Sequence, residues 1–96
     1  MNQRETCLSI RNLETDTLIV LVEPWAEEYE VSGGATIQLR FRGPDGGFPE
    51  LEHSRSRLTV YGWPGSSFSV FRDDVEISHG GGSIGAPPTP AMSRDS

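Results

Sequence analysis

Hydrophobic and polar residues alternate with a period of two along most of the chain, which is the pattern of half-buried β-strands. The clearest case is "ATIQLRFR", residues 35–42, where Ile37, Leu39 and Phe41 share one face. Shorter or weaker strand patterns occur in residues 7–12, 17–23, 28–31, 48–53, 57–63, 68–72 and 75–78. Seven or eight short strands separated by turn signals predict an all-β fold, a small antiparallel β-sandwich that is immunoglobulin- or cupredoxin-like in shape.

Three segments carry more specific signals. Residues 18–22 are apolar at five consecutive positions, which predicts a central strand covered on both faces. Pro49 places the strand at 48–53 at a sheet edge. The segment "PWAEEY", residues 24–29, begins like a helix, but Gly33 and Gly34 follow so soon that we expect at most one helical turn.

Glycine and proline concentrate at the C-terminal end of the chain. Residues 79–96 hold four of the 11 glycines and three of the seven prolines, which predicts a disordered tail after a β-sandwich domain at residues 1–78. Within this tail, "GGGSIG" matches both the dinucleotide fingerprint and the nucleophile elbow. The prolines of "APPTPA" come next and exclude the helix that either motif requires, so neither function is expected.

The charge balance narrows the choice of partners. The formal net charge is −6, and all eight basic residues are arginine. Nucleic acids and anionic membranes both attract basic surfaces, so we expect neither as a partner and favour a protein with a basic surface. No apolar run reaches signal-peptide or transmembrane length, which predicts a cytoplasmic protein.

The residue types of catalysis and metal binding are sparse. Cys7 is the single cysteine, so an internal disulfide or a thiolate cluster is excluded, and we expect this side chain to be half-buried. His53 is expected to be an exposed strand residue. Because no nucleophile, base and orienting group occur together, we expect no enzyme activity, no cofactor and no metal ligand set.

The stretch "EPWAEEYEV", residues 23–31, holds four carboxylates, one tryptophan and one tyrosine. In one interpretation Trp25 caps an end of the sandwich and the glutamates are solvated. In a second, Trp25 and Tyr29 are anchors of a partner-binding surface, and a third makes the carboxylates a cation site. The candidate partner-binding residues are Trp25, Glu27, Glu28, Tyr29 and Glu30.

"LVEPWAEEYEVSGGATIQLRF", followed by "RLTVYGWPGSSFSVFRDDVEI", resembles a group of small uncharacterised bacterial proteins. Those proteins carry "LEPWGEEY", a "PPG" turn, "VWGWPGS" and "VFRDG", and the resemblance covers about residues 6–78. The chain departs from them at Ser32, Gly33 and Gly34 and at Asp74. The resemblance implies a bacterial β-sandwich and brings no activity, cofactor or catalytic residue.

These observations favour a non-catalytic protein-binding or assembly module with an acidic, aromatic-tipped surface. One alternative is an inhibitor or immunity-type protein that blocks a basic enzyme groove. The other is a metal-binding or enzymatic β-sandwich, which the missing ligand and catalytic sets disfavour.

The composition of the C-terminal segment leads to a first prediction. Deleting residues 80–96 leaves the melting temperature of the protein within a few degrees, because a segment so poor in large hydrophobic residues buries little apolar surface. Thermal unfolding followed by circular dichroism measures this. A large drop in melting temperature would place the domain boundary elsewhere.

Overall fold

The computed structural model describes residues 2–77, which form eight β-strands and no helix. The strands are β1 Gln3–Arg11, β2 Leu18–Glu23, β3 Glu27–Val31, β4 Thr36–Pro44, β5 Glu50–Ser54, β6 Arg57–Tyr61, β7 Ser67–Arg72 and β8 Val75–Glu76. The predicted all-β class and number of strands are therefore confirmed. The predicted tail, residues 79–96, lies outside the described residues. The described part contains no helix that is long and apolar enough to cross a membrane.

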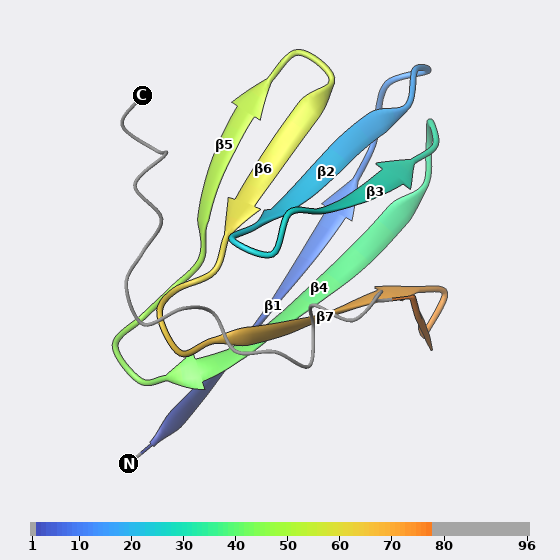
Figure 1. Cartoon of the computed structure of the whole chain (residues 1–96). Helices are drawn as coiled ribbons and strands as arrows, with labels where there is room; N and C mark the ends of the chain where they lie inside the picture. Colours follow the sequence, from blue (N-terminus) through green and yellow to red (C-terminus); the bar gives the residue numbers. More distant parts are fainter. Residues whose placement is uncertain (1, 78–96) are drawn as a thin grey trace.

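The strands form two four-stranded sheets, which lie in separate layers (Figure 1). Sheet A has the order β1-β4-β7-β8, and sheet B has the order β3-β2-β6-β5. Five of the six pairings are antiparallel, but β2 and β6 pair in parallel, with Val20 beside Leu58. Two hairpins, β2–β3 and β5–β6, lie side by side in sheet B, and this placement brings two strands of the same direction together.

The hydrophobic core fills the space between the two sheets. Ile37, Leu39 and Phe41 of β4 are completely buried, as their alternation predicts. They meet apolar side chains of the opposite sheet; the core residues that sheet B contributes are Val20, Val22, Tyr29, Val31 and Val60. The strand period thus determines which residues of each sheet are buried.

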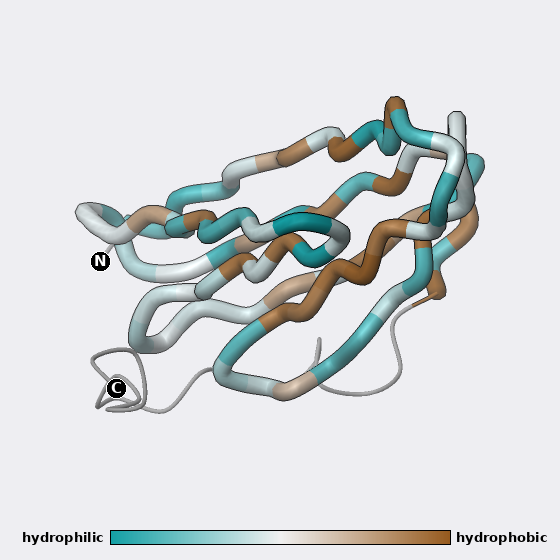
Figure 2. Tube along the Cα trace, turned by 90° about the horizontal axis from the view of Figure 1, so that it is seen from above, coloured by the Kyte–Doolittle hydropathy of each residue, from teal (hydrophilic) through white to brown (hydrophobic). Residues whose placement is uncertain are grey.

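The central strand β2 departs from its prediction on one face. It lies between β3 and β6, and Val20 and Val22 are completely buried. Ile19 and Leu21, on the opposite face, are only half-buried, so the prediction that both faces are covered is wrong. Each sheet of a two-layer structure keeps one solvent face, and Ile19 and Leu21 lie on that face of sheet B. The apolar run is the long brown segment in Figure 2.

A tight turn, rather than a helical turn, connects β2 to β3. Residues 24–26 form this turn, the Glu23–Pro24 peptide bond is cis, and Ala26 has a φ of 61°. The turn directs Trp25 across the end of the sandwich, where its ring centroid lies 4.6 Å from that of Phe68 in sheet A. The chain at Gly62 comes so close to the indole that an added Cβ would lie 2.7 Å from the Cη2 atom of Trp25.

Trp63 lies in the connection that crosses from β6 in sheet B to β7 in sheet A. It is 7% exposed, and its Nε1 atom donates a hydrogen bond of 3.0 Å to the carbonyl oxygen of Pro44. Its ring centroid is 6.1 Å from that of Phe41, which is also 6.1 Å from Phe68. The four rings of Trp25, Phe41, Trp63 and Phe68, the aromatic cluster, therefore close one end of the sandwich.

The short loops follow their predicted chemistry. Asp73 and Asp74 both have positive φ values, 52° and 65°, as a two-residue type I′ hairpin turn requires. Aspartate tolerates this conformation better than most residues do. The predicted hairpin between β7 and β8 is therefore present.

The position of Trp25 leads to a stability prediction. Trp25→Ala lowers the free energy of unfolding by about 3 kcal/mol, near the lower end of the range for core tryptophans because the ring is half-buried. Urea unfolding of both proteins measures the difference. The matched control is Phe48→Ala, which removes an aromatic ring that is 60% exposed. Equal, small losses for the two variants would contradict the capping role of Trp25.

Candidate binding surface

The structure divides the five residues predicted as a partner-binding site between two environments. Tyr29 is 4% exposed and belongs to the core. Trp25 is half-buried; it belongs to the aromatic cluster and packs against the core. Glu27 is half-buried and accepts a hydrogen bond of 3.1 Å from the Tyr29 hydroxyl. Glu28 and Glu30 alternate to the opposite face of β3 and are exposed. Of the five predicted residues, only Glu28 and Glu30 therefore face solvent on the flat surface of the sheet.

The registers of sheet B show which residues accompany these glutamates on its outer surface. Leu21 lies between Glu28 of β3 and Thr59 of β6, and the residues opposite Thr59 and Tyr61 continue the surface onto β5. We call this surface the acidic face; it consists of Ile19, Leu21, Glu23, Glu28, Glu30, Glu50, Glu52, Ser54, Arg57, Thr59 and Tyr61.

Negative charge is concentrated on the acidic face. Five glutamates from three strands and one arginine give it a formal charge of −4, against −6 for the whole chain. The outer surface of sheet A has the opposite sign, since its strands carry Glu5, Arg11, Arg40, Arg42 and Glu76. The two broad faces of the sandwich therefore differ in charge, which a net charge alone does not reveal.

An ion pair crosses the apolar centre of the acidic face. Arg57 of β6 and Glu28 of β3 approach to 3.7 Å although β2 lies between their strands. The pair thereby spans the half-buried side chains of Ile19 and Leu21. Both charged side chains are about half exposed, and such surface pairs contribute at most about 1 kcal/mol. The pair therefore contributes little to the stability of the fold.

Tyr61 is the aromatic residue of the acidic face. It is half-buried, and its hydroxyl donates a hydrogen bond of 2.7 Å to the Oε1 atom of Glu52. The alternation of "RLTVY" already assigns Tyr61 to the face opposite Val60, but it gives no indication that β5 and β6 would bring Tyr61 beside Glu52. The sequence alone therefore does not identify Tyr61 as part of this surface.

Two arginines on the outer surface of sheet A interact with side chains of their own sheet. The Arg40 guanidinium lies 4.1 Å from the ring centroid of Phe71, and Arg42 pairs with Glu5 at 3.6 Å. Cys7 is exposed on the same surface, so the expectation of a half-buried thiol is wrong. The cause is its position in β1, where every second residue from Glu5 points to solvent.

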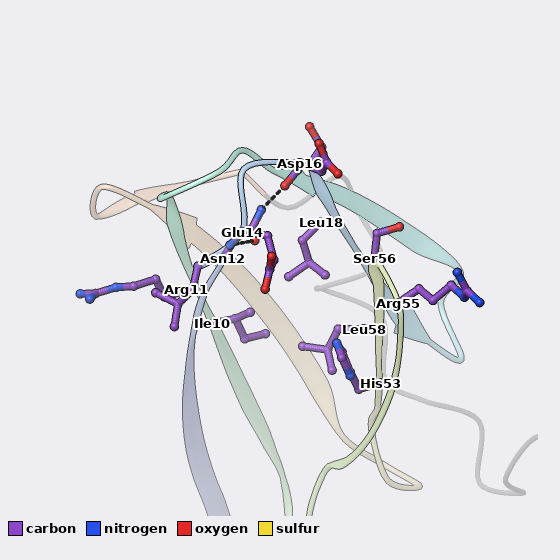
Figure 3. A pocket seen from close by; sticks show the side chains of 12 residues that line it. Ile10, Arg11, Asn12, Glu14, Asp16, Leu18, His53, Arg55, Ser56 and Leu58 are labelled. Atoms are coloured by element: carbon purple, nitrogen blue, oxygen red, sulfur yellow. Dashed lines mark hydrogen bonds between the residues drawn. The ribbon is translucent and has the colours of Figure 1, made fainter.

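An open groove of about 630 Å³ lies where the two sheets separate, between β1 and the β5–β6 hairpin. Ile10, Leu18 and Leu58 form its apolar floor, whereas Arg11 and Arg55 point away from it (Figure 3). His53 is exposed beside the groove, as predicted.

The most buried polar side chain near this groove, Asn12, serves the adjacent loop. Its Nδ2 atom donates hydrogen bonds to the carbonyl oxygens of Asp16, at 2.7 Å, and Val31, at 2.9 Å. Its Oδ1 atom accepts a hydrogen bond of 3.0 Å from the backbone N–H of Glu14. The amide is therefore used to join the β1–β2 loop to β3, and it is not directed at a ligand.

Within residues 2–77, no three His, Cys, Asp or Glu side chains are grouped closely enough to hold a metal ion. In that same range, every fully buried side-chain nitrogen or oxygen has a hydrogen-bond partner. Comparisons of the chain with family models, curated proteins and solved structures find no match.

Proposed function

We propose that the protein is a non-catalytic binding module whose acidic face binds a basic surface of another protein. The observation that carries this proposal is the gathering of five glutamates around Ile19 and Leu21 on one sheet face. A negatively charged surface speeds the association of a positively charged partner. The half-buried apolar side chains provide nonpolar surface, and its burial on binding is favourable.

The proposal changes the residues that were expected to act as anchors. Trp25 and Tyr29 stabilise the fold, so the aromatic contact to a partner comes from Tyr61, while Glu28 and Glu30 keep their expected role. Tyrosine is frequent in the energetically important centres of interfaces because it combines apolar area with a polar end. The single exposed cysteine fits a reducing compartment, so we place the module in the cytoplasm.

An inhibitor of a basic enzyme would use the same face, and the two hypotheses differ in the partner. A sheet face presents its charges in one layer, whereas a groove is best filled by a protruding loop. The glutamates of the acidic face all lie on strands, which favours a flat basic surface as the partner.

Binding by the acidic face is tested with a triple variant, Glu28→Gln, Glu30→Gln and Glu52→Gln. Proteins captured from the native host by the wild type are identified, purified and titrated against both forms at two salt concentrations. The variant loses about tenfold or more in affinity for a basic partner, mainly at low salt, because it lacks three of the steering charges.

The matched control is Asp73→Asn, Asp74→Asn and Glu76→Gln, which changes the charge equally. These three residues are exposed on the β7–β8 hairpin of sheet A, and asparagine is tolerated in the turn. The control keeps wild-type affinity. Equal losses in the two triple variants, or no loss in either, would contradict the proposed surface.

A further inference from the structure

Strand β1 is the longest exposed edge of the described structure. It has nine residues and pairs only with β4, and its other side has no neighbouring strand within residues 2–77. Its register with β4 is uninterrupted, and it contains no proline. Proline and bulges are common means of preventing an edge from pairing with another chain. This edge has neither.

The backbone groups that face this open edge can be assigned from the two ends of the β1–β4 ladder. At one end the N–H of Asp45 donates to the carbonyl of Asn2, and at the other the N–H of Asn12 donates to the carbonyl of Ala35. Hydrogen-bonded and non-hydrogen-bonded residues alternate in an antiparallel ladder, so the even-numbered residues of β1 face β4. The residues whose N–H and C=O groups face outward are Gln3, Glu5, Cys7, Ser9 and Arg11.

The charges on the edge strands distinguish β1 from β3 and β5. Antiparallel self-pairing of β3 would bring Glu28 and Glu30 of two copies together, and self-pairing of β5 would do the same with its glutamates. Like charges on directly paired strands are destabilising. On β1 the outer surface instead carries one residue of each sign, Glu5 and Arg11. A second copy of this strand is therefore the complementary occupant.

The charges also select one register. When two β1 strands run antiparallel with Leu8 at the centre, Glu5 of each copy lies opposite Arg11 of the other, and Cys7 lies opposite Ser9. The register with Cys7 at the centre places Glu5 opposite Ser9 and forms no directly opposed ion pair. Only the register centred on Leu8 satisfies both charges across the two-fold axis.

Sheet B does not completely cover the inward-pointing side chains of this edge. Leu8 points toward the interior of the sandwich but is only half-buried. The groove between the two sheets opens beside Ile10, near the end of β1 (Figure 3). In the register centred on Leu8, this side chain meets Leu8 of the second copy, which removes further apolar surface from water.

We infer that the protein forms a homodimer in which the β1 strands of two copies pair antiparallel about Leu8. The two four-stranded sheets A become one eight-stranded sheet. A two-fold axis perpendicular to that sheet places both acidic faces on the same side. The dimer thus presents two binding surfaces to one partner assembly, which raises the effective affinity when both can engage.

The dimer is tested by sedimentation of the full chain over a range of concentrations, with Ser9→Pro and Ser9→Ala side by side. The wild type and the alanine variant reach twice the 10.5 kDa mass of one chain. The proline variant dissociates at about tenfold or more higher concentration, because each copy loses an outward N–H that only the dimer uses. Dimerisation unaffected by proline, or a wild type that is monomeric throughout, overturns the inference.

A cross-linking experiment tests the register and does not depend on the folding of the proline variant. In a hydrogen-bonded pair the Cα atoms are about 5.5 Å apart, a separation that a disulfide spans. Ser9→Cys, with Cys7 retained, therefore forms a covalent dimer under mild oxidation with diamide much faster than the wild type does. Rapid cross-linking of the wild type through Cys7 alone, or equal rates for both proteins, overturns the register centred on Leu8.

Discussion

The contact between Trp25 and Phe68 is the interaction on which the arrangement of the molecule depends. It joins the β2–β3 turn of sheet B to β7 of sheet A, with the two ring centroids 4.6 Å apart. Because the indole is held across the end of the sandwich, β3 leaves the turn with Tyr29 directed inward. The period of two then places Glu28 and Glu30 outward. The segment that follows this contact therefore exposes Glu28 and Glu30 and buries Tyr29.

The division of this segment into inward and outward side chains also explains the composition of the acidic face. The tryptophans are shielded or half-buried, so the acidic face has Tyr61 as its aromatic residue and Ile19 and Leu21 as its apolar centre. The ion pair between Arg57 and Glu28 crosses this centre but contributes little to stability. The proposed partner can therefore displace this pair at little cost. In the proposed dimer, two such surfaces on one side would raise the effective affinity for a partner that engages both.

Local sequence patterns predict much of this fold. Strand alternation identifies Ile37, Leu39 and Phe41 as core residues, and it places Glu28 and Glu30 together on one face, because these properties depend only on the period of the strand. The pattern also leaves two interpretations of Trp25 open. The structure favours the cap, since the ring meets Phe68, a residue distant in sequence.

The properties that the sequence does not predict are those that depend on strand order. The parallel pairing of β2 with β6 brings Arg57 near Glu28, and the pairing of β5 with β6 brings Glu52 to Tyr61. Neither neighbour follows from spacing along the chain. The apolar run in β2 is misleading for a related reason, because Leu21 lies on the solvent face of sheet B in a two-layer structure.

A double-mutant cycle between Trp25 and Phe68 tests most directly whether the tryptophan holds the two sheets together. Trp25→Leu, Phe68→Leu and the double variant retain apolar side chains but remove the contact between the rings. Urea unfolding of the four proteins gives the coupling free energy. The structure predicts a coupling of about 1 kcal/mol, the usual strength of a packed aromatic pair. Losses that add within about 0.3 kcal/mol would show that the rings do not interact, and they would contradict the placement of Trp25 in the core.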